Sequence, residues 1–135
     1  MTRLTALLAT LLLVVTSAAL AQGEDAQFFA NVIASDVNGV LSECPSYVQE
    51  GLDPGQSAAC FDLDSSEDLA RLQLENALAG YSDIDVVGPW ERSDDGWIVF
   101  RSWYYEPDDN FVAFGIQDVG EMFEVRVLVL VVPVD

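Results

Sequence analysis

Carboxylate side chains are the groups in this sequence with the widest chemical scope. The 135 residues include 23 Asp and Glu and five Arg, with no Lys or His, and the formal net charge is −18. Without His there is no Ser–His or Cys–His nucleophile pair, and without Lys there is no Schiff base and no P-loop lysine. What remains is the chemistry of two carboxylates across a cleft, such as hydrolysis of a glycosidic bond.

A short run of oxygen-bearing side chains suggests calcium as a second chemistry. Asp62, Asp64 and Asp68 alternate with other residues, as ligands do at the start of an EF-hand loop. That loop also needs Gly at its sixth position and Glu at its twelfth, where this sequence has Glu and Gln. The segment is more typical of a polar turn that caps a helix. We therefore expect no metal and no cofactor, with these three residues as a weaker calcium candidate.

An aromatic segment carries the side chains best suited to binding. Four of them share one face of the strand predicted over residues 97–105: Trp97, Arg101, Trp103 and Tyr105. Trp, Tyr and Arg are enriched at interface hot spots, so an exposed face of this kind would bind a partner. Alternatively, the N-terminal helix covers this face and Arg101 pairs with Glu91 or Glu124 on a neighbouring strand.

The two cysteines, Cys44 and Cys60, predict a disulfide. In an exported protein an even number of cysteines indicates pairing, and two cysteines allow one connectivity. The bond would close a loop rich in Pro and Gly and stabilise it by about 3 kcal/mol.

The first residues predict an export signal over residues 1–21. Arg3 precedes an apolar run from Leu4 to Val15, and Ala19-Leu20-Ala21 is the small-x-small pattern of a cleavage site. An uncleaved membrane anchor is the alternative. Cleavage would leave a secreted, periplasmic or cell-envelope protein with no stable membrane span. Four arginines would then oppose all 23 carboxylates, and this balance excludes nucleic acid as a partner.

The helices and strands that the sequence predicts indicate an α+β domain. An N-terminal helical segment occupies residues 22–43, with a helix that ends or kinks near Asn38-Gly39. The rest, residues 44–135, begins with the disulfide loop 44–60, where residues 58–63 form a short strand or an extended chain. A helix over 66–79 has Ser caps, acidic residues in its first turn and a Leu stripe. Four segments over about 84–132 are joined by short turns and predict an antiparallel meander with this helix on one face.

The last of these strands is apolar on one face throughout and on both faces in its second half. It is either a central strand covered by both helices or an apolar edge through which the chain forms a homodimer.

The sequence supports three functions. The first is a small exported acidic binding domain, without catalysis, that recognises a protein or a small molecule. The second is a carboxylate-dependent hydrolase, and the third is a structural envelope protein whose acidity gives salt tolerance.

Overall fold

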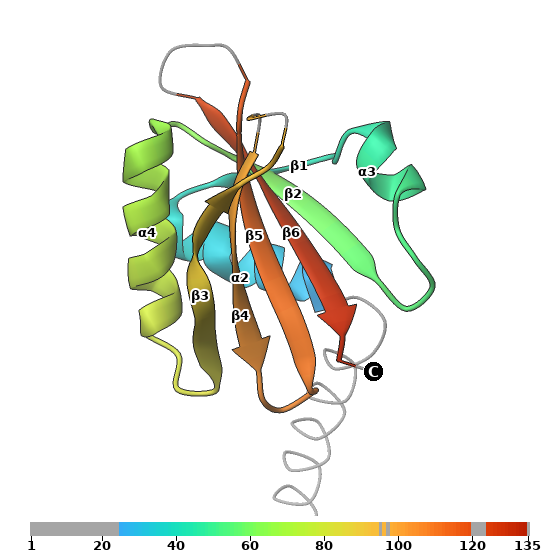
Figure 1. Ribbon diagram of the computed structural model, residues 1–135. Helices are drawn as coiled ribbons and strands as arrows, with labels where there is room; N and C mark the ends of the chain where they lie inside the picture. The colour runs from blue at the N-terminus through green and yellow to red at the C-terminus, as the bar shows by residue number, and fades with distance from the viewer. Residues whose placement is uncertain (1–24, 95, 97, 120–123, 135) are drawn as a thin grey trace, which may run out of the picture.

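The protein is an α+β domain with a six-stranded antiparallel sheet (Figure 1). The computed structural model describes residues 25–94, 96, 98–119 and 124–134. The predicted signal peptide at residues 1–21 and Trp97 lie outside them. The predicted fold class is confirmed, but the sheet has six strands where the sequence predicted four.

The sheet has the strand order β1-β2-β6-β5-β4-β3, with every neighbouring pair antiparallel. The strands are β1 (Val40–Ser42), β2 (Ser57–Leu63), β3 (Ile84–Arg92), β4 (Ile98–Tyr105), β5 (Asn110–Asp118) and β6 (Val125–Pro133). Strands β3 to β6 form the predicted meander, because short turns between consecutive strands make them antiparallel neighbours.

The two additional strands are β2 and β1. Strand β2 pairs with β6, and β1 pairs with the other edge of β2. The pairing runs from Ser57 opposite Val131 to Leu63 opposite Val125. Since β5 occupies the other side of β6, the last strand is central and both its edges are hydrogen-bonded. The alternative that this strand is an exposed edge is therefore wrong.

The outer strand β3 is a poor template for another strand. Its pairing with β4 is irregular between Val87 and Glu91, where Gly88 has a φ of +73° and Pro89 follows. Proline cannot donate a hydrogen bond, and a bulge twists an edge away from a flat partner.

The first described helix, α2 (Asp25–Val37), ends where the sequence predicted. Asn38 has a φ of +60°, and the amide of Gly39 donates to the carbonyl of Ala34 at 2.7 Å. Gly39 also needs its small size, because a Cβ atom there would lie 2.7 Å from the ring of Phe61. The chain therefore turns tightly from α2 into β1.

Helix α4 (Glu67–Ala79) lies where the sequence predicted a helix. The predicted Ser cap is also present, because the Ser66 hydroxyl accepts a hydrogen bond from the amide of Leu69. The predicted Leu stripe is partly wrong, since Leu69 is 49% exposed and Leu72 is 56% exposed. The buried face is narrower and follows the spacing of four residues: Ala70, Leu74 and Leu78. The exposed Leu69 and Leu72 lie just outside this row.

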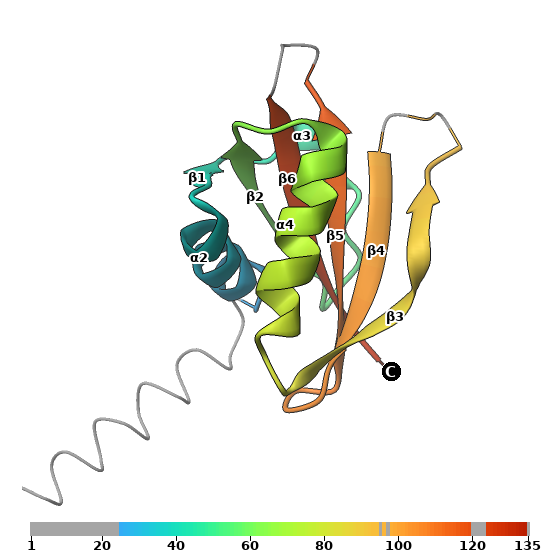
Figure 2. The same cartoon turned by 90° about the vertical axis from the view of Figure 1, so that its left-hand side faces the viewer.

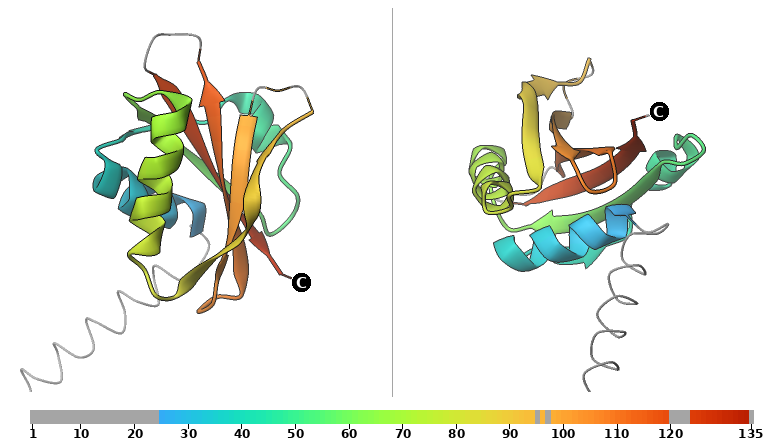
Figure 3. Two further views of the ribbon diagram at one scale, coloured as in Figure 1. Left: turned by 60° about the vertical axis from the view of Figure 1, so that its left-hand side comes forward. Right: turned by 90° about the horizontal axis from the view of Figure 1, so that it is seen from below.

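Helices α2 and α4 cover the same face of the sheet (Figures 2 and 3). The core lies between them and includes fully buried side chains from each layer: Ile33, Phe61, Leu74, Leu78, Phe114 and Ile116. The five-residue helix α3 (Ser46–Glu50) lies on the opposite side of β2 from α2 (Figure 3, right). Within the described residues, no helix combines the length and apolar character needed to cross a bilayer.

Candidate functional site

The aromatic face predicted for binding points toward the helices. Trp103 is 4% exposed, and its ring packs edge-to-face on Phe114 with centroids 5.5 Å apart. Tyr105 packs in the same way on Phe29 of α2, at 4.9 Å. The structure therefore places these two side chains against the core, and Trp97 lies outside the described residues.

Arg101 is held by helix α4. Its Nη1 lies 3.0 Å from Oε1 of Glu75, its Nε donates to the carbonyl of Gly88 at 2.8 Å, and its guanidinium lies 5.9 Å from the ring of Trp103. The same Glu75 oxygen accepts a hydrogen bond from Nε1 of Trp90 at 2.6 Å. The partner of Arg101 is thus a residue of α4, and neither strand residue named in the sequence alternative, Glu91 or Glu124, takes this place.

A second ion-pair group joins α4 to the edge strand about two helical turns earlier, at Glu67. Glu67 accepts from Arg71 at 3.0 Å and from Arg92 at 2.8 Å. Hydrogen bonding and charge attraction from Arg92 lower the pKa of Glu67 below its ordinary value. These two groups fasten α4 along β3 and β4, which is a structural role.

A depression of about 320 Å³ lies where α4 meets β3 and β4. Its lining includes Arg101 and Trp103 from the predicted face, together with Glu75 and Asp85. Arg101 and Glu75 are paired with each other, so neither offers an unpaired charge to a ligand in this depression.

The calcium candidates do not converge. Asp62 lies 3.3 Å from Nε of Arg126 and accepts from the Ser42 hydroxyl, whereas Asp64 and Asp68 are exposed beside the start of α4. Across the described ranges, no three His, Cys, Asp or Glu side chains are grouped as a metal ion requires. Asp62 therefore links β2 to β6.

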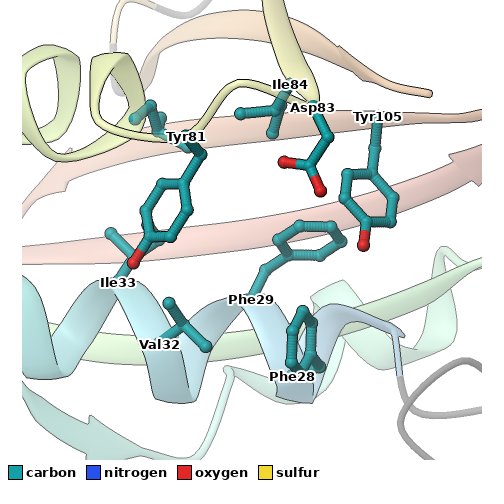
Figure 4. Close-up of a pocket in the computed structure, with 9 residues that line it drawn as sticks. Phe28, Phe29, Val32, Ile33, Tyr81, Asp83, Ile84 and Tyr105 are labelled. Carbon is teal, nitrogen blue, oxygen red and sulfur yellow. The ribbon is translucent and has the colours of Figure 1, made fainter. Parts of the chain in front are cut away.

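A small cavity lies between α2 and the beginning of the meander (Figure 4). Phe28, Phe29, Asp83 and Tyr105 are among the residues that line it. Tyr81 lies at its edge and donates to Asp36 at 2.6 Å, and this hydrogen bond raises the pKa of Tyr81. The cavity has a volume of about 70 Å³, far below the roughly 300 Å³ of a small ligand pocket. It can hold water but not a larger ligand.

The face of the sheet opposite α2 and α4, here called the open face, carries a larger hollow. The register places Ser102 of β4, Ala113 of β5 and Leu130 of β6 side by side. In the next row on the same face, Gly115 of β5 and Leu128 of β6 are neighbours. The central strand β5 thus presents two very small residues between larger ones, which creates a trough along it.

Helix α3 forms one wall of this trough. The predicted Cys44–Cys60 disulfide is confirmed, and it joins the chain just before α3 to β2. A second link comes from Gln117 of β5, whose Nε2 donates to the Tyr47 hydroxyl of α3 at 2.9 Å. The disulfide loop is therefore attached to the sheet on its open face.

Together the trough and its wall form the open-face groove, with a volume of about 540 Å³. This volume falls in the range of small-molecule sites. Its lining comes mainly from α3 and its loop and from β4, β5 and β6, and includes Val48, Leu52, Ile98, Phe100, Phe111, Leu128, Leu130 and Val132. Among the described residues that line it, none is charged, although the chain has a net charge of −18.

The sequence reasoning missed this groove because it gave the aromatic face the binding role. The signal was present in two places. The second half of β6 is apolar on both faces, and β5 alternates large core residues with the small Ala113 and Gly115. No family model, curated protein or solved structure matches the chain, so the groove is interpreted from this chain alone.

Proposed function

We propose that this chain is a small exported binding domain, without catalysis, that takes an apolar small molecule into the open-face groove. The observation that carries the proposal is an uncharged, apolar hollow of about 540 Å³ in a strongly acidic chain. Burying apolar ligand surface contributes about 25 cal/mol per Å², so such a lining favours an apolar ligand without any charged contact.

The chain's other features support an exported protein of this kind. The Cys44–Cys60 disulfide is compatible with an oxidising compartment outside the cytoplasm. The polar groups in the groove are few, and include Gln56, Ser93 and Ser102. A few convergent polar groups in an apolar lining are typical of sites that orient a ligand.

The alternative functions receive less support from this site. No Asp or Glu is among the described residues that line the groove, so the groove offers neither the acid nor the nucleophile of a glycosidase. A purely structural envelope protein would not need an apolar hollow on an uncovered sheet face.

The test is titration of the oxidised protein with a neutral apolar fluorophore, N-phenyl-1-naphthylamine. We expect saturable binding with one ligand per chain. Ala113→Phe places a ring in the trough and should weaken binding by at least about tenfold. Ser35→Phe is the matched control, because it adds the same ring to the exposed side of α2.

Thermal unfolding and near-ultraviolet circular dichroism would establish that both variants keep the fold. Ser102→Phe, in the same row as Ala113, provides a second way to fill the trough. If the unmodified protein shows no saturable binding, or if folded Ala113→Phe and Ser102→Phe proteins bind as well as it does, the proposal is wrong.

A further inference from the structure

We infer that the ligand of the open-face groove is a small amphiphile with an apolar body and a cationic head, such as an alkylammonium. This inference rests on the proposed function and adds the charge of the ligand and its molecular class. Three observations support it: the groove has an uncharged lining, exposed carboxylates are adjacent in sequence to lining residues, and the arginines are paired with carboxylates.

Exposed carboxylates are adjacent in sequence to residues that line the groove. On the wall formed by α3, Glu50 precedes Gly51 and Asp53 follows Leu52, and both carboxylate side chains are exposed. Near the β3–β4 turn, the exposed Asp94 follows Ser93. A cationic head that emerges from the apolar floor would therefore find negatively charged residues within one position of the lining, both at α3 and at the β3–β4 turn.

The arginines give an anionic head nothing comparable. In the described residues every arginine is already paired with a carboxylate: Arg71 and Arg92 with Glu67, Arg101 with Glu75 and Arg126 with Asp62. The chain has no Lys or His. No arginine is among the described residues that line the groove, and an anionic ligand would also be repelled by the net charge of −18.

The floor of the groove also favours a small molecule over a peptide. The groove lies over β4, β5 and β6, whose backbone groups are used in the pairing of adjacent strands. An extended peptide laid on this face would find few free amides or carbonyls with which to pair. An alkyl chain requires none.

The experiment compares decyltrimethylammonium, decanol and decanoate, three probes that share a decyl-length apolar body and differ in charge. Calorimetric titration of the oxidised protein is done with each probe below the concentration at which it forms micelles. We expect the cation to bind more tightly than the alcohol, and the anion most weakly. Raising NaCl to 1 M should remove most of the difference, because the screening length falls to about 3 Å.

A charge-matched pair of variants locates the effect. Glu50→Gln/Asp53→Asn should weaken binding of the cation by about three- to fivefold and leave decanol unchanged, as expected for exposed charge pairs. Asp64→Asn/Asp68→Asn changes the net charge equally at the start of α4 and should alter neither probe.

The outcomes separate this inference from the proposed function. If all three probes bind equally and Ala113→Phe abolishes binding of each, the groove binds apolar ligands and the inference about charge is wrong. If the two charge variants weaken the cation equally, its preference reflects the overall charge, and the inference also fails. If none of the three probes binds but N-phenyl-1-naphthylamine does, this inference alone is wrong; if the fluorophore does not bind either, the proposed function fails with it.

Discussion

The disulfide between Cys44 and Cys60 joins the wall of the open-face groove to its floor. Cys60 lies in β2, opposite Leu128 of β6, and Leu128 lines the groove. Cys44 stands two residues before α3, whose Tyr47 and Val48 also line it. One covalent bond therefore stabilises the fold and holds the shape of the candidate site.

Removal of this bond by Cys44→Ala/Cys60→Ala should reduce the free energy of unfolding by about 3 kcal/mol, since the bond closes a loop with a sequence separation of 16. Denaturant unfolding of the variant, with the reduced unmodified protein as control, measures this loss. The variant should also bind N-phenyl-1-naphthylamine more weakly, because α3 would be held mainly by the Gln117–Tyr47 hydrogen bond. Unchanged affinity in a folded variant would show that the wall does not need the bond.

The buried face of α4 can be tested with two leucines that lie two residues apart. Leu74 is fully buried and Leu72 is 56% exposed. Leu74→Ala should lower the free energy of unfolding by about 3 kcal/mol, because it removes core contacts and leaves a cavity. Leu72→Ala should change it by no more than about 0.5 kcal/mol. Equal losses in urea unfolding would contradict the packing described for this helix.

Glu75 should stabilise the contact between α4 and the sheet. Glu75→Gln removes the charge that pairs with Arg101 but keeps a group able to accept from Trp90. We expect a loss of about 1 kcal/mol, less than is usual for a charged hydrogen bond, because the Glu75 side chain is 34% exposed and solvent screens its charge. A double-mutant cycle with Arg101→Met measures the coupling between the two residues. A coupling energy of zero would show that the ion pair contributes nothing to stability.

The pH dependence of stability should reveal the Glu67 ion pairs. Arg92 and Arg71 lower the pKa of Glu67 in the folded protein below its ordinary value of 4.5. The charged carboxylate therefore stabilises the fold above pH 4.5, and this contribution is lost as the pH falls through the folded-state pKa. The difference in unfolding free energy between the unmodified protein and Glu67→Gln should be constant near neutral pH and shrink below pH 4.5.

The measurement is urea unfolding of both proteins at a series of pH values. Repeating it in an Arg92→Met background provides the control, because the largest cause of the pKa shift is then absent. A difference that stays constant down to pH 3 in the presence of Arg92 would contradict the assignment.

The local features of the sequence determined much of this protein. Asn38-Gly39 ended one helix and Ser66 began another, because capping depends on the few residues at a helix end. Two cysteines allowed a single disulfide, and short turns determined the order of the last four strands. Each of these features depends on residues close together in the chain or on a count of one residue type.

Only the tertiary structure decided which face of the aromatic strand is covered. The alternation of a strand places Trp103 and Ser102 on opposite faces, but it does not say which face meets a helix. That choice depends on α4, whose Leu74 and Glu75 pack toward the Trp103 side. The groove likewise needs Ala113 of β5, Leu130 of β6 and α3 together, and α3 reaches the other two only when β2 pairs with β6 and the disulfide joins the chain before α3 to β2.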